Sequence, residues 1–226
     1  MRRLAILSLF FSANALAEST LVDTIAKFTD IFGISFSQQN GNTVTTLDAN
    51  YYITEDLRVF GDIDTDINWE VGAGYSVWKG DTYYTENSFK VSEYKISTGI
   101  FTAKVLSQNW TAIGDINYNY KFESDYCLSS TCLTYIPSNS IDYSAGVIWS
   151  PIQYFDLLYK FNHEIGFSNN TWNGTQNGIN ISTGKTDLNY HEMILFLNIK
   201  QLRPSVTYTY FEEREDTIEF GLTFDF

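Results

Sequence analysis

The chain has 226 residues, and its 14 Lys and Arg against 27 Asp and Glu give a formal net charge of −13. Such an acidic chain is poorly suited to binding nucleic acid through phosphates or to attaching to anionic lipid by charge. Aromatic residues make up 17% of the sequence, yet no apolar run long enough for a membrane-spanning helix follows the N-terminal region. This combination is typical of strands that place an apolar residue at every second position.

The first 17 residues have the order of a secretory signal peptide. Arg2 and Arg3 form a short positive region, residues 4–11 are almost all apolar, and Ala-Leu-Ala at residues 15–17 has the small-x-small form of a cleavage site. The apolar stretch is too short to cross a bilayer. We therefore expect residues 1–17 to be removed on export and the mature chain to begin at Glu18.

Residues 18–30 do not follow the two-residue period of the rest of the chain. Leu21, Ile25 and Phe28 are spaced for one face of a short helix. The segment is interpreted either as a small periplasmic plug or cap, or as a frayed leader before the first strand. The frayed leader is the simpler interpretation and is the expectation for residues 18–30.

From residue 31 onward, apolar and polar residues alternate in segments of about ten residues, the length a tilted strand needs to cross a bilayer. In one such segment, Trp69, Val71 and Tyr75 alternate with Glu70 and Gly74. Together with the turn residues between segments, this pattern predicts twelve strands. They are expected at residues 31–39, 43–53, 57–65, 68–78, 82–88, 91–105, 109–122, 140–150, 154–167, 187–200, 204–212 and 216–226. Ten strands result if 82–105 is one long bent strand and a loop, and eight if the loops are longer.

The connections are of two kinds. The short ones, such as those near residues 54–56 and 79–81, are assigned to the periplasm, and the long polar stretches 123–139 and 168–187 to the outside. Trp78, Trp110 and Trp149 lie beside predicted periplasmic turns, where indole rings favour the headgroup layer. A soluble β-sandwich would share the alternation, but it would not explain these aromatic positions.

The final strand carries the most specific signal. Phe220, Leu222, Phe224 and the terminal Phe226 fall on one face, opposite Glu219 and other polar residues. A last strand of this kind resembles the signal that the barrel assembly machinery of Gram-negative bacteria reads. With the signal peptide, the chain is similar to outer-membrane β-barrel proteins. This resemblance implies an antiparallel up-and-down transmembrane β-barrel over residues 31–226, surrounded by outer-membrane lipid.

The strand register also predicts which charged side chains face the interior. The predicted pore-lining set is Asp48, Arg58, Asp62, Asp64, Glu70, Asp115, Asp142, Asp156, Lys160 and Glu219. Acidic residues outnumber basic ones, and rings of carboxylates favour cations. The expected function is a small porin-like channel for passive passage of small neutral or cationic solutes. In the alternative, the charges pair and close the lumen, as in other small barrels.

The sequence offers few residues for a disulfide, a metal site or catalysis. Cys127 and Cys132 are the only cysteines and lie in a predicted outer loop, so we expect a disulfide. A zinc site is not expected, because no His lies near them. His163 and His191 fall in register with the lipid-facing residues, and the sequence around His163 does not match the His-Ser motif of barrel hydrolases. We therefore predict no catalytic residue, metal or cofactor.

In size and strand number, the chain resembles small twelve-stranded porins that take up acidic oligosaccharides. Their lumens are lined by basic residues, whereas the inward set predicted here is mainly acidic, so acidic sugars are not expected as solutes. A second hypothesis is a closed barrel whose external loops mediate adhesion or surface recognition. It rests on the loop that holds Cys127 and Cys132 and on the Asn-, Gly- and Thr-rich stretch 169–184.

Overall fold

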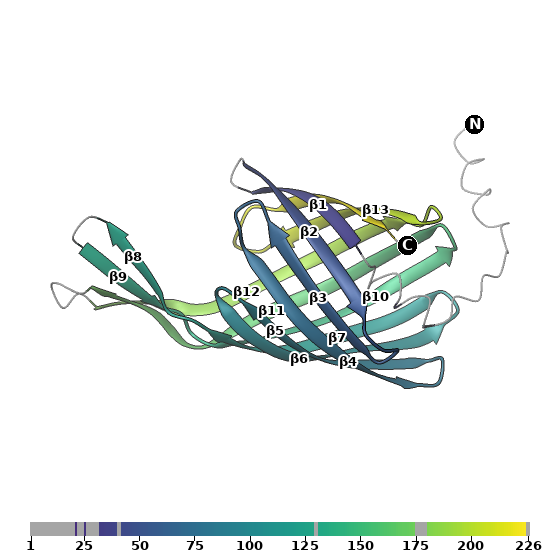
Figure 1. The fold of residues 1–226 in the computed structure, drawn as a ribbon, viewed down its shortest axis with the longest axis horizontal. Coiled ribbons are helices and arrows are strands. Elements are labelled where there is room, and N and C mark those ends of the chain that lie inside the picture. Colours follow the sequence, from purple (N-terminus) through teal and green to yellow (C-terminus); the bar gives the residue numbers. More distant parts are fainter. Residues whose placement is uncertain are drawn as a thin grey trace.

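A computed structural model describes residues 21, 25, 32–39, 42–128, 131–174 and 180–224. In this part of the chain, fourteen strands form one antiparallel sheet (Figure 1). The strands are β1 (Phe32–Gln39), β2 (Asn42–Tyr52), β3 (Leu57–Asp64), β4 (Trp69–Lys79), β5 (Tyr83–Ser92), β6 (Lys95–Ser107), β7 (Trp110–Lys121), β8 (Ser124–Leu128), β9 (Thr131–Ile136), β10 (Ser140–Ile152), β11 (Phe155–Gly174), β12 (Asn180–Leu197), β13 (Leu202–Phe211) and β14 (Thr217–Phe224). Among the described residues, no helix is long and apolar enough to cross a membrane.

Twelve of these strands close into a barrel. Each pairs with its neighbours in chain order, β7 pairs directly with β10, and β1 pairs with β14 in a register that places Phe32 opposite Phe224. Closure leaves no unpaired edge in the ring, which is the condition for a sheet to cross hydrocarbon. The predicted twelve-stranded antiparallel barrel is confirmed. The ten-stranded alternative is wrong, because β5 and β6 are separate strands joined by a bend at residues 93–94. The eight-stranded alternative is wrong, because twelve strands pair in the closed ring.

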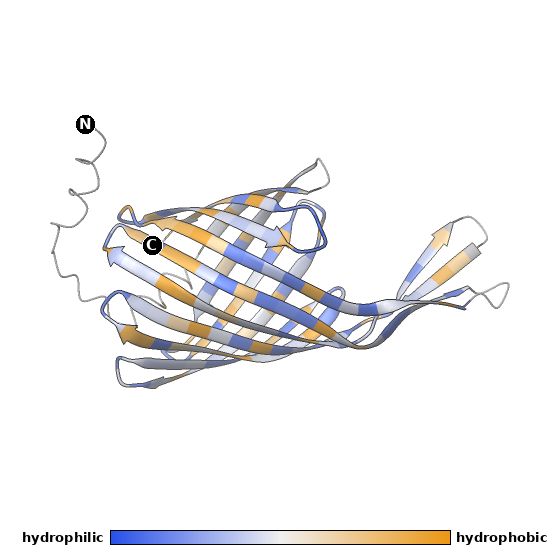
Figure 2. Ribbon diagram, turned by 180° about the vertical axis from the view of Figure 1, so that it is seen from behind, coloured by the Kyte–Doolittle hydropathy of each residue, from blue (hydrophilic) through white to orange (hydrophobic). Residues whose placement is uncertain are grey.

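The barrel has an apolar outer face and a mainly polar inner face. Apolar and polar residues alternate along the strands (Figure 2), and outward side chains such as Val71, Tyr75 and Phe220 are about half exposed. A continuous exposed apolar surface of this kind is unfavourable in water and favourable in a bilayer. The outer surface is therefore the surface that a membrane-spanning barrel requires.

The two ends of the barrel differ. The short turns at residues 53–56, 80–82, 108–109, 153–154 and 198–201 lie at the end where β1 begins and β14 ends, here called the turn end. At the other end, the hairpin end, β11 and β12 continue beyond the ring, and β9 pairs with the last part of β11. This extension, with the β8–β9 hairpin, projects far from the barrel (Figure 1).

The long polar stretches 123–139 and 168–187, in which the sequence predicted no strands, contain strand structure. Residues 124–128 and 131–136 are strands, and β11 and β12 extend to Gly174 and back to Asn180. On one face of this extension, Tyr126, Tyr135 and Trp172 form an aromatic cluster, with the Trp172 ring centroid 5.4 Å from that of Tyr126 and 4.7 Å from that of Tyr135. Strand pairing satisfies backbone groups that a loop would leave to water.

The predicted disulfide is confirmed. Cys127 and Cys132 are bonded and lie opposite each other in the β8–β9 register, with their Cα atoms 4.0 Å apart. A crosslink over so short a loop stabilises by about 2 kcal/mol in the chain-entropy model, and it acts on a hairpin outside the ring.

A Cys127→Ser/Cys132→Ser variant is therefore expected to loosen the hairpin and leave the barrel intact. Amide hydrogen exchange in β8 and β9 should accelerate roughly tenfold or more, the factor that about 2 kcal/mol allows. Exchange in β3 and β4 serves as the internal control and should not change. Equal acceleration in both regions would show that the disulfide supports the whole barrel.

Candidate functional site

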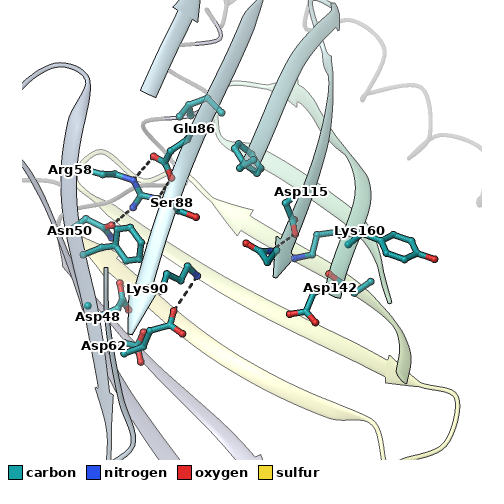
Figure 3. A pocket seen from close by; sticks show the side chains of 18 of the residues that line it. Asp48, Asn50, Arg58, Asp62, Glu86, Ser88, Lys90, Asp115, Asp142 and Lys160 are labelled. Carbon is teal, nitrogen blue, oxygen red and sulfur yellow. Dashed lines mark hydrogen bonds and ion pairs between the residues drawn. The ribbon is translucent and has the colours of Figure 1, made fainter. Parts of the chain in front are cut away.

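A cavity of about 520 Å³ lies inside the barrel. One wall is formed by β2 to β6, and the other by β7, β10, β11 and β12 (Figure 3). Because side chains alternate across a strand, every second residue of these strands points toward the cavity. Of the predicted pore-lining set, Asp48, Arg58, Asp62, Glu70, Asp115, Asp142 and Lys160 line it.

Arg58 and Glu86 form the central ion pair of the first wall. The Arg58 Nε and Nη2 atoms lie 2.7 and 2.8 Å from the two Glu86 carboxylate oxygens, and Nη1 donates to Asn50 Oδ1 at 2.5 Å. The Tyr84 hydroxyl donates to Glu86 Oε2 at 2.8 Å. A two-pronged pair of this type fixes both side chains more firmly than a single contact does. It therefore holds β3 and β5 in a defined relation across β4.

Gly74 is required for this arrangement. A Cβ atom at this position of β4 would lie 2.6 Å from the Glu86 carboxylate carbon. A side chain there would therefore displace the Glu86 carboxylate from its place beside Arg58.

Three further basic residues of the two walls are paired with carboxylates as well. Lys90 lies 3.1 Å from Glu70, Lys160 lies 3.0 Å from Glu192, and Lys121 lies 2.5 Å from Glu164. Each of these ammonium groups thus has a carboxylate partner, and their positive charges are locally compensated. Inward ion pairs of this kind are one way in which small barrels are stabilised from inside.

A second set of carboxylates has no such partner. Asp48 and Asp62 lie on the first wall, and Asp115 and Asp142 lie on the opposite wall (Figure 3). Within the described residues, no Lys or Arg nitrogen lies within 4 Å of these four carboxylates. Neutral groups contact two of them, since Asn119 Nδ2 donates to Asp142 at 2.6 Å and the Ser144 hydroxyl donates to Asp115. The cavity therefore holds an excess of negative charge contributed from both sides.

Three predicted pore residues lie away from this cavity. Glu219 lines a smaller cavity of about 240 Å³, together with Asp48 and Arg203. Asp64 instead accepts hydrogen bonds from the Asp66 and Asn68 amides at 2.8 and 3.0 Å, so it closes the β3–β4 turn. The alternation predicts the face on which Asp64 falls, but not that the next turn would engage its side chain.

Asp156 is buried in the wall rather than presented to either cavity. It accepts a hydrogen bond from Asn198 Nδ2 at 2.6 Å and lies 3.8 Å from Arg203 Nη2. The Arg203 guanidinium stacks over the Phe196 ring at 3.9 Å. This cluster joins β11, β12 and β13 at the turn end, so its role is to hold the wall together.

The sequence prediction missed Glu86 and Lys90, which lie on the inner face of β5. On either side of Glu86, the outward residues of β5 are Thr85 and Asn87, and both are polar. Because these two outward positions are polar, the alternation that marks the other strands is interrupted in the first half of β5. The inward pattern Tyr84, Glu86, Ser88 and Lys90 would have been recognisable only once the strand was known to continue to Ser92.

The two histidines lie in a band of aromatic residues on the outer side of β10 to β13. His163 Nδ1 is 2.7 Å from the Tyr143 hydroxyl, and its Nε2 is 2.8 Å from Asp187 Oδ1. His191 Nδ1 is 2.8 Å from the Tyr159 hydroxyl. In the described part of the chain, no serine hydroxyl hydrogen-bonds to either imidazole, and no group of three potential metal ligands is found. The arrangement is that of hydrogen-bonded rings in an aromatic belt.

Comparisons with known proteins find similarity at the level of structure. No family model and no curated protein matches the chain. The NanC porin superposes with a TM-score of 0.67 and 11% identity over 86% of this chain and 100% of its own. The KdgM porin in complex with disordered oligogalacturonate gives 0.65 and 9% over 86% and 98%. An outer-membrane channel from Pseudomonas putida F1 gives 0.57 and 11% over 86% and 92%. At these identities, what is shared is the barrel fold.

Proposed function

We propose that this chain is an outer-membrane channel through which small neutral and cationic solutes pass passively. The observation that carries the proposal is the charge balance of the cavity. Arg58, Lys90 and Lys160 are each bound to a carboxylate, whereas further carboxylates on both walls have no basic partner. Unpaired carboxylates in a narrow pore attract cations and repel anions. The apolar outer face and the fold of bacterial outer-membrane channels support the location.

The proposal also covers how the chain is exported and assembled in the outer membrane. Residues 1–17 would act as the cleaved signal, and the outward row Phe220, Leu222 and Phe224 of β14 would be read, with Phe226, by the barrel assembly machinery. Residues 1–17 and Phe226 lie outside the described residues. Phe220 is exposed on the outer face, as recognition of this row requires.

Acidic oligosaccharides do not suit this cavity. The KdgM porin has been solved in complex with oligogalacturonate, which is an acidic sugar. Here the three basic groups that line the cavity, on Arg58, Lys90 and Lys160, are already paired with Glu86, Glu70 and Glu192. Entry of an anion would require breaking those pairs and approaching the remaining carboxylates. A polar neutral or positively charged solute faces neither cost.

Single-channel recording tests the proposal. The chain from Glu18 onward, refolded and checked by its heat-dependent gel mobility, is inserted in planar bilayers under a potassium chloride gradient. We expect discrete conductance steps and a reversal potential that shows preference for potassium over chloride. A preference for chloride would contradict the proposal. The absence of steps from both this chain and a Leu21→Asn/Ile25→Asn variant would also contradict it.

A second function is favoured by one observation at the hairpin end. Tyr126 is 54% exposed and lies beside Trp172 on a sheet that projects from the barrel, and exposed aromatic clusters often mark binding surfaces. A closed barrel with an adhesive hairpin would use this cluster. Bacterial cells that display the protein should then adhere to mucin-coated plates, and a Tyr126→Ser/Trp172→Ser variant should not. Equal adhesion of the two would dismiss this function.

A further inference from the structure

One patch of the inner wall is apolar, in contrast to the polar wall around the cavity. At the turn end, Tyr84 of β5 and Ala103 of β6 are fully buried, and Trp78, Phe101, Val105 and Ile113 surround them. The Tyr84 ring lies 4.5 Å from that of Trp78 and 6.0 Å from that of Phe101. An apolar wall facing a water-filled pore is unfavourable unless something covers it. This patch is called the inner apolar patch below.

Leu21 and Ile25 cover the patch. Both are in helical conformation, and they are 0% and 3% exposed against Tyr84 and Ala103. Residues four apart lie on the same side of a helix, so both side chains can insert into one patch. Their burial is not what a frayed leader would show. The spacing of Leu21 and Ile25 instead reflects a specific contact with the barrel interior.

The position of this contact within the ring matters for conduction. In the closed order of twelve strands, β6 and β7 lie opposite β1. Leu21 and Ile25 precede β1 in the chain, yet they pack against β5, β6 and β7, on the far side of the bore. Ile25 also lines the main cavity, beside Phe101 and Glu86. The two residues therefore occupy space inside the channel at its turn end.

We propose that Leu21 and Ile25 form an internal plug that narrows the channel at the turn end. This inference rests on the proposed function, since a plug has meaning only in a conducting barrel. The plug is held by apolar contact with the inner apolar patch. The carboxylates nearer the middle of the barrel determine which ions pass, and the plug limits the size of the ion current.

A Leu21→Asn/Ile25→Asn variant tests the plug by making both side chains polar at similar size. We expect its single-channel conductance to rise at least twofold over that of the unchanged chain, with the same preference for cations. The matched control is Ile53→Asn/Leu106→Asn, which makes the same change at exposed positions of the turn end. The control should conduct as the unchanged chain does. Equal conductance of all three chains would overturn the plug and leave the channel in place.

Cysteine labelling tests the same contact without relying on conduction. The native cysteines are joined in a disulfide, so Ile25→Cys provides a single free thiol. A water-soluble maleimide should label it at least tenfold more slowly than Leu106→Cys, and adding Leu21→Asn should abolish the protection. Equal labelling at positions 25 and 106 would overturn the plug. Slow labelling with silent bilayers for every variant would instead overturn the channel, and with it the plug's role in conduction.

Discussion

Replacing Glu86 with Ala is expected to destabilise the barrel by about 3 kcal/mol, because removing one partner of a buried ion pair leaves the other charge uncompensated. The side chains of Arg58 and Glu86 are only 15% and 5% exposed. The substitution would also remove the acceptor of the Tyr84 hydroxyl. The free energy of unfolding is measured by urea titration in lipid vesicles, with tryptophan fluorescence as the signal.

Glu70→Ala is the matched control for this loss. It also removes a lumenal glutamate from an ion pair, but its partner Lys90 is 36% exposed and the two charged atoms are 3.1 Å apart. A solvated pair of this kind contributes less than about 1 kcal/mol. An Arg58→Met/Glu86→Leu variant should recover much of the loss, since it leaves no unpaired charge. Equal destabilisation by Glu70→Ala and Glu86→Ala would show that the Arg58–Glu86 pair has no special role.

The sequence predicted the ring well because the bilayer enforces its pattern. Hydrocarbon outside and water inside require apolar and polar residues to alternate along each crossing strand. Most predicted strand ends therefore lie within two residues of those observed, as for β3 and β7. The pattern weakened at β5, where Thr85 and Asn87 face outward. It gave no guidance for β8 and β9, because beyond the ring no hydrocarbon selects one face of the strand.

The site was predictable in part, for a related reason. Alternation predicts which face a side chain occupies, and Asp48, Arg58 and Asp142 line the interior cavity. It does not show which inward residues meet. Arg58 pairs with Glu86 from two strands away, and Lys121 of β7 pairs with Glu164 of β11 across β10. These pairs depend on the tilt and stagger of the closed ring. The helical spacing of Leu21 and Ile25 was also visible, but not the inner apolar patch against which they pack.

Reversing two lumenal charges should invert the ion preference of the proposed channel. Asp62 and Asp142 contribute carboxylates from opposite walls of a cavity of only about 520 Å³. At 0.1 M salt, charges act over about 10 Å before screening, so each wall should influence ions along much of the bore. In an Asp62→Lys/Asp142→Lys variant, we expect the reversal potential to change sign. The ratio of potassium to chloride permeability should fall roughly tenfold or more.

Two further variants separate the effect of the lumen from that of net charge. Asp62→Asn/Asp142→Asn keeps the shape of both side chains and should reduce the cation preference without inverting it. Asp81→Lys/Glu213→Lys changes the net charge as much as the reversal does, but at exposed residues in the turns that follow β4 and β13, so the ion preference should barely change. If this control shifts selectivity as far as the lumenal reversal, the surface potential sets the preference. If only the lumenal variants shift the ion preference, and the reversed variant shifts it further than the neutral one, then the unpaired lumenal carboxylates select the ion. They do so because every solute that passes through the barrel must come close to them.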